Sequence, residues 1–142
     1  MTVKWYGDEF MSKIEDATAA GLEACAAVVE ADAVLNCPVH DSLLRNSIYR
    51  EVDRDEKRAR VGASAEYAAA VEYGRRPGKM PPVDALRKWA KDILGDAGLA
   101  FPIAKKIASA GTKSQPYLRP ALDNNARKFS GIMARELRRV TG

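Results

Sequence analysis

The sequence has few of the residues that build catalytic or metal sites. Its 142 residues include one histidine, His40, and two cysteines, Cys25 and Cys37. Cys37 and His40 have a C-x-x-H spacing, but there is no second pair of ligands to complete a tetrahedral site. A glycine-rich phosphate loop is also missing, because Gly74 and Gly78 flank arginines and do not link a strand to a helix. We therefore expect no metal and no cofactor.

A catalytic constellation is missing as well, since a nucleophile needs an adjacent base and a group that orients the base. Asp41 could orient His40, but no serine or cysteine stands in a nucleophile-elbow context. Cys37 precedes a proline in an expected loop, and a loop histidine beside a capping aspartate is more simply structural or exposed. The sequence predicts that the protein is not an enzyme, and a small hydrolase using Cys37 or His40 is the weakest alternative.

Long apolar runs are absent too, and none approaches the roughly 20 residues of a membrane helix. The first residues lack the apolar core and cleavage site of a signal peptide, so we expect no membrane partner and synthesis in the cytoplasm. Cys25 and Cys37 on one helix would lie about 18 Å apart, whereas a disulfide tolerates about 7 Å between Cα atoms. The length suits a single domain over residues 1–142.

Charge is divided unevenly along the chain. Residues 1–74 hold 8 Lys and Arg against 14 Asp and Glu, a net charge of −6, and residues 75–142 hold 15 against 5, a net charge of +10. A basic half is typical of nucleic-acid binding. The same polarity also lets identical subunits meet acidic face to basic face around a ring. Scattered solvated charge that happens to be uneven is the third interpretation.

The first half of the chain predicts one long helix followed by a hairpin. Apolar and small residues recur at three- and four-residue steps over residues 8–35, and Pro38 ends this helix. Gly21 indicates either close packing or an ordinary tolerated glycine. Asp41 or Ser42 can cap a short helical segment. Residues 48–52 and 59–62 then predict two strands around the charged turn 53–57.

A short helix, a loop, two further helices and a terminal helix are expected next. Residues 61–74 predict the end of a strand, a break and two helical turns that Gly74 stops. Residues 75–82 predict a loop, and helices follow over residues 83–94 and from Pro102, at a first helical position, to residue 111. The last helix is expected from Pro120, with a basic polar side that also complements its dipole. The predicted fold class is α+β, with a long N-terminal helix packed on a small antiparallel β-sheet, a helical insert and a C-terminal helix.

Three short phrases occur in an order that carries a family resemblance. Residues 67–74 contain Tyr-Ala followed by Val-Glu-Tyr-Gly, and residues 115–122 read Gln-Pro-Tyr-Leu-Arg-Pro-Ala-Leu. Residues 37–48 contain a proline, then Leu-Arg and Ser-Ile. Together they resemble the tail-completion and head-tail joining proteins of long-tailed bacteriophages, a family of minor tail components. Asp41-Ser42 stands where that family commonly has Thr-Gly, and the insert of residues 80–111 is longer than in its shortest members.

The resemblance implies a structural virion protein of the neck or upper tail, made in the host cytoplasm and assembled as a homo-oligomeric ring, with six copies suggested by tail symmetry. Its expected partners are copies of itself, head-closure proteins and tail-terminator or tail-tube proteins, with possible passage of DNA through the ring. The alternative is a basic nucleic-acid-binding module. The residues expected at a subunit or partner interface are Tyr67, Glu72, Tyr73, Gly74, Arg75, Arg76, Tyr117, Leu118 and Arg119. For Tyr73 and Tyr117, half-buried core packing is an equal alternative.

Overall fold

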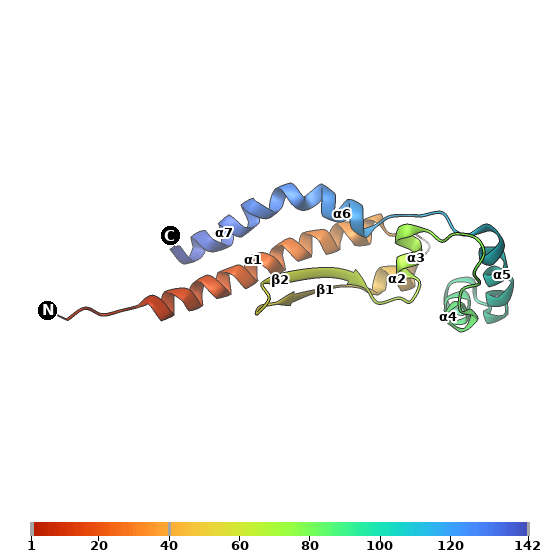
Figure 1. The fold of residues 1–142 in the computed structure, drawn as a ribbon, viewed down its shortest axis with the longest axis horizontal. Helices are drawn as coiled ribbons and strands as arrows, with labels where there is room; N and C mark the ends of the chain where they lie inside the picture. The colour runs from red at the N-terminus through yellow and green to blue at the C-terminus, as the bar shows by residue number, and fades with distance from the viewer. Residues whose placement is uncertain (1, 40, 142) are drawn as a thin grey trace.

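A single long helix organises the molecule. The computed structural model describes residues 2–39 and 41–141, and α1 (Gly7–Asn36) runs along most of its length (Figure 1). Many alanines favour this helix and keep it thin. It ends where predicted, because Cys37, which precedes a proline, has an extended backbone with ψ of 143°.

The two strands of the predicted hairpin form beside α1. β1 (Ile48–Asp53) and β2 (Arg58–Ala63) pair antiparallel, and the predicted hairpin is confirmed. The side chain of Asp53 closes the turn by accepting the N–H groups of Asp55 and Glu56, each at 3.0 Å. Because a two-stranded ribbon is marginal alone, its packing along α1 is what stabilises it (Figure 1).

Two short helices flank the hairpin. Asp41 caps α2 (Ser42–Asn46), since its carboxylate accepts the N–H of Leu44 at 3.0 Å, as predicted. After β2 the chain forms α3 (Ala68–Tyr73), which ends at Gly74 with φ of 74°. The predicted helix stop at Gly74 is therefore confirmed.

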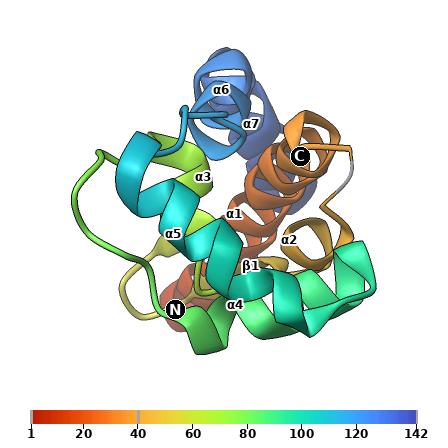
Figure 2. The same cartoon turned by 90° about the vertical axis from the view of Figure 1, so that its right-hand side faces the viewer.

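The insert lies at the end of the molecule away from the N-terminus, where Figure 2 shows α4 and α5 in front of the other elements. It consists of α4 (Val83–Trp89), a π-helical turn η1 (Ala90–Leu94), a 3₁₀ turn η2 (Ala97–Leu99) and α5 (Ala100–Ala110). The predicted helix to residue 94 is correct in extent, but its last turn widens to π geometry. The predicted start at Pro102 is wrong by two residues. Proline is tolerated there because the first four helical N–H groups have no intrahelical acceptor.

The C-terminal helix is divided rather than continuous. α6 (Leu118–Asn125), the 3₁₀ turn η3 (Ala126–Lys128) and α7 (Phe129–Thr141) follow one another along α1 (Figure 1). The prediction of one helix from Pro120 is therefore wrong at its start and in its continuity. The break follows the buried Asn125, whose side-chain amide donates to the carbonyl of Ala121 at 2.7 Å and competes with the backbone for that acceptor.

The core is small and lies where these elements meet α1. Its buried members are Val29, Ala33, Cys37, Leu44, Ala68, Tyr117 and Ala121. Further along α1, a Cβ atom on Gly21 would meet the end of the flexible Met133 side chain at 2.4 Å but the Cα atom of Met133 only at 3.5 Å, so α7 lies close to α1 here without requiring glycine. The α+β fold class is confirmed, with the long helix packed on the antiparallel hairpin on one side and on α6 and α7 on another.

Candidate subunit interface

Two of the three chain segments that carry the family resemblance, residues 67–74 and 115–122, lie against each other. Arg75 and Thr112 exchange backbone hydrogen bonds of 2.9 and 2.8 Å as an isolated antiparallel bridge. The N–H of Gln115 donates to the carbonyl of Val71 at 2.8 Å. We call this pairing of residues 71–76 with residues 111–119 the joint. It is the place where the insert leaves the body of the molecule and returns to it.

Glu72 occupies the centre of the joint, with only 6% of its surface exposed. One carboxylate oxygen accepts the N–H groups of Tyr117 and Leu118 at 2.8 and 2.9 Å, and the other accepts that of Arg119 at 2.8 Å. These donors belong to the start of α6 and have no acceptor within the helix. A carboxylate there also interacts favourably with the positive end of the helix dipole. Glu72 in α3 therefore caps α6, which has no capping side chain of its own.

Tyr117 anchors the other side of the joint in the core. Its side chain is completely buried, and its hydroxyl donates to the carbonyl of Ala68 at 3.5 Å. Burial, followed by the negative charge of Glu72, raises the pKa of Tyr117 to about 12. The phenol therefore stays neutral, and its role is to pack in the core.

Two glycines permit the close approach of the strands in the joint. Gly74 has φ of 74° and Gly111 has φ of 71°, both in a region that favours glycine. A Cβ atom on Gly74 would lie 2.8 Å from the carbonyl oxygen of Thr112, and one on Gly111 would lie 2.3 Å from that of Arg75. A side chain at either position would force the paired backbones apart.

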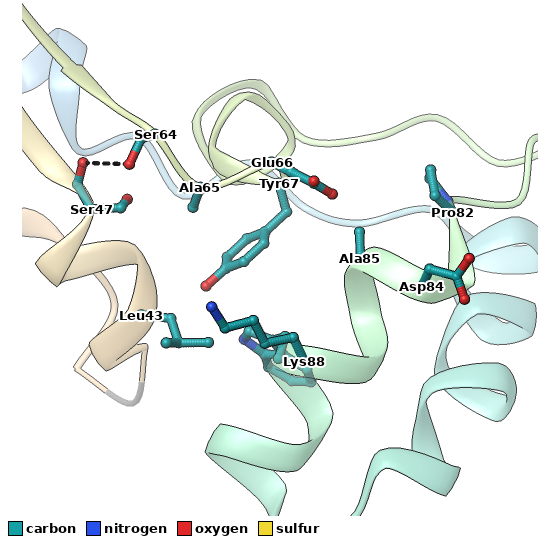
Figure 3. A pocket seen from close by; sticks show the side chains of 11 residues that line it. Leu43, Ser47, Ser64, Ala65, Glu66, Tyr67, Pro82, Asp84, Ala85 and Lys88 are labelled. Atoms are coloured by element: carbon teal, nitrogen blue, oxygen red, sulfur yellow. Dashed lines mark hydrogen bonds between the residues drawn. The ribbon is translucent and has the colours of Figure 1, made fainter.

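Tyr67 links α3 to the cap of α2. Its hydroxyl donates to the same Asp41 oxygen that caps α2, at 2.7 Å. Burial and the hydrogen bond to Asp41 raise the pKa of Tyr67 far above its usual value. Figure 3 shows its ring pointing into a cavity of about 510 Å³ between α2 and α4, near Leu43 and Lys88. Tyr67 thus lines the open space between the body and the insert while its hydroxyl stays bonded to the body.

An open apolar groove runs beside the joint, and we call it the α1 groove. It has a volume of about 700 Å³, with α1 at its base, β2 along one side and α6 and α7 along the other. Its apolar lining includes Leu22, Val29, Val61, Leu118, Phe129 and Met133. Tyr73 stands at its edge with 82% of its surface exposed, and Tyr49 also lines it with 45% exposed. A groove of this kind is the main feature on this part of the surface that a protein partner could fill.

The structure separates the residues expected at an interface into two groups. The side chains of Glu72 and Tyr117 are buried within the chain. A partner would therefore contact the exposed residues around them and not these two side chains. For Tyr117 this is the core-packing alternative, and for Tyr73 the ring is exposed instead. Tyr73, Arg76 and Arg119 are exposed, while Tyr67, Gly74, Arg75 and Leu118 are half-buried. The groove itself, which includes α1 and β2, was missed by sequence reasoning.

The residues considered for chemistry do not form a site in the described part of the chain. Cys25 and Cys37 are free, buried thiols, and burial raises the pKa of each, which disfavours the reactive thiolate. His40 lies outside the described residues. Among residues 2–39 and 41–141, no group of three or more His, Cys, Asp or Glu side chains is placed to hold a metal ion. Within those same ranges, no helix is both long and apolar enough to cross a membrane.

One comparison with known proteins gives a match. The HK97-gp10-like family model, described as "Bacteriophage HK97-gp10, putative tail-component", matches residues 3–74, which is half of the chain. The match covers α1, α2, the hairpin and α3, and it includes Glu72 and Tyr73. No curated protein and no solved structure matches the chain.

Proposed function

Because the chain belongs to the HK97-gp10-like family of bacteriophage tail components, we propose that it joins tail to head as a ring-forming structural subunit. Family membership makes it a tail-related structural component of the virion, which contacts other phage structural proteins. In the proposal, six copies form a ring in the neck or upper tail. The ring contacts head-closure proteins on one side and tail-terminator or tail-tube proteins on the other.

The observation that carries this proposal is the α1 groove with Tyr73 at its edge. Large exposed apolar surfaces on a small protein mark contacts with partners, and tyrosine is enriched at the centre of protein interfaces. Tyr73 is 82% exposed although it adjoins the buried Glu72. The joint fixes the position of α3, so a partner meets Tyr73 in one orientation. A rigid aromatic anchor lowers the entropy lost on assembly.

The distribution of charge supports contact between identical copies. Residues 7–23 of α1 carry five acidic side chains and one lysine, whereas residues 118–141 carry six basic and two acidic side chains. Although α7 packs along α1 within the chain, a head-to-tail contact would bring the acidic part of one copy's α1 to the basic α7 of its neighbour, and this type of contact closes into a ring. Such complementarity also selects the correct partner and speeds association.

A second candidate function is nucleic-acid binding, either by the chain alone or along a DNA channel through the ring. The observation that favours it is the exposed basic side of η3 and α7, where Arg127, Arg135 and Arg138 form no ion pair with another described residue. Contacts of this kind weaken steeply as salt is added. A mobility-shift assay with duplex DNA tests it, and no binding at low salt would remove this candidate.

The decisive experiment for the main proposal is deletion of this gene from a phage or prophage that carries it. We expect filled heads and tails to accumulate separately in negative-stain micrographs, and a plasmid copy of the gene to restore joined particles. A plasmid copy with a stop codon is the matched control. Normal joined particles in the deletion strain would overturn the proposal.

A further inference from the structure

The first residues of the chain form an exposed apolar segment with no partner among the described residues that covers it. Its large apolar side chains are 50% or more exposed: Val3, Trp5, Tyr6, Phe10 and Met11. Figure 1 shows this segment extending beyond the hairpin and the end of α7. Leaving one indole ring, one phenol ring and one phenylalanine ring in water forgoes much of the stabilisation that burial gives. A binding partner would recover it.

The α1 groove of the same chain is out of reach of this segment. Trp5 precedes α1 by two residues, which span about 7 Å when extended. Leu22, the groove-lining residue of α1 nearest to its start, lies 15 residues after Gly7 on the same helix, a distance of about 22 Å. The segment therefore cannot fold back into its own groove while α1 is intact.

The groove of a second copy matches the apolar character of the segment. Its volume of about 700 Å³ accommodates the aromatic rings of the segment, two of which precede α1 and one of which lies in its first turn. The acidic side chains Asp8 and Glu9 are balanced by two lysines, so residues 2–13 have no net charge, and Asp8 is the acidic group left without an ion pair among the described residues. Arg60 and Arg119 also line the groove, and each makes only an exposed ion pair, with Glu51 at 3.5 Å and with Asp123 at 3.1 Å. Exposed pairs of this type are weak and exchange partners readily.

We infer that residues 2–13 of one copy bind in the α1 groove of the neighbouring copy. The inference rests on the proposed ring and specifies the contact that builds it. Each copy donates its N-terminal segment and accepts that of another, which is a heterologous contact that repeats around a closed ring. Tyr73 of the accepting copy then packs on the incoming segment. This contact explains why its ring is exposed in the single chain.

Cysteine cross-linking between two differently tagged copies tests this arrangement. Both carry Cys25→Ala to remove the thiol in the groove. One copy carries Lys4→Cys in the segment and the other Leu122→Cys in the groove, and in the matched control the second copy carries Lys105→Cys on the exposed surface of the insert. All three positions are exposed in the chain, so the variants are expected to fold. Oxidation is performed on purified mixtures and on particles complemented with both copies.

We expect the 4–122 pair to form covalent heterodimers roughly a hundredfold faster than the 4–105 pair, because docking raises the effective concentration of the two thiols. If native mass spectrometry or micrographs show a ring but the two pairs react equally, the inference is overturned and the proposed function stands. If neither the purified chain nor the particles contain an oligomer, the proposed ring fails and this contact fails with it.

Discussion

The carboxylate of Glu72 accepts the backbone N–H of Tyr117 at 2.8 Å, although 45 residues separate the two in the sequence. This bond and its two companions connect α3 to the start of α6 across the base of the insert. The same contact explains why α6 begins at Leu118 and holds Tyr73 at the edge of the α1 groove. Folding of the body and presentation of the candidate interface therefore depend on one side chain.

Replacing Glu72 by glutamine is expected to destabilise the protein. Glutamine keeps the shape but loses the charge, and its amide group turns one acceptor into a donor that faces N–H groups. Hydrogen bonds to charged groups contribute about 1.5 to 3 kcal/mol each, so we expect the free energy of unfolding to fall by about 3 kcal/mol. Urea unfolding measures the change. The exposed Glu66→Gln is the matched control, and equal stability of the two variants would contradict the assignment of Glu72 as a cap.

Two glycine-to-alanine changes are expected to act in opposite directions. Gly74 has φ of 74° and ψ of 177°, and an added Cβ atom would lie 2.8 Å from backbone atoms of Thr112 and Ser114. Backbone strain of this type costs about 1 to 3 kcal/mol before the clash is counted. Gly131 lies in α7 with nothing within 4 Å of an added Cβ atom, so alanine there stabilises the helix by about 1 kcal/mol. Thermal unfolding of both variants checks this, and a neutral Gly74→Ala would contradict it.

The local parts of the fold could be predicted from the sequence because their causes are local. The apolar period and Pro38 define α1, and the alternation around the charged turn defines the hairpin. Gly74 stops α3 through its own backbone conformation. Each of these signals lies within a few residues of the feature it determines.

The cap of α6 and the division of the C-terminal helix could not be predicted in the same way. Each depends on a distant side chain: Glu72 in the first case, and in the second Asp32, whose 2.5 Å bond helps to hold the buried Asn125 at the break. One signal was available: Tyr117 stands at the N-cap of α6, where Ser, Thr, Asp or Asn is preferred. A helix start without its own cap requires an acceptor from elsewhere. The α1 groove depends on six separate elements, α1, β1, β2, α3, α6 and α7, and leaves no comparable trace in the sequence.

Alkaline pH is expected to weaken the fold through Tyr117. Its pKa is raised to about 12 in the folded chain, against about 10 in the unfolded chain. Between these values the unfolded chain releases a proton that the folded chain keeps, so stability is complete below about pH 10 and falls by about 1.4 kcal/mol per pH unit above it. Tyr117→Phe removes this titrating group, so the free energy of unfolding of the variant should fall less steeply above pH 10, by about 1.4 kcal/mol less per pH unit. Tyr67, whose pKa is raised in the same direction, contributes equally to both proteins. Urea unfolding over a series of alkaline buffers measures the slopes, and identical slopes would contradict the prediction.

Replacing Tyr73 by serine is expected to separate assembly from stability. Its ring is 82% exposed in the single chain, so the free energy of unfolding should change by no more than about 0.5 kcal/mol. A tyrosine at the centre of an interface contributes about 2 kcal/mol or more to binding, and the loss is repeated at every contact of a ring. Complementation of a deletion strain with Tyr73→Ser should therefore yield few joined particles while the purified variant unfolds like the original protein. Val39→Ser, at a residue 77% exposed in the connection before α2, is the matched control. Normal particle yield with Tyr73→Ser would move the subunit contact away from the α1 groove.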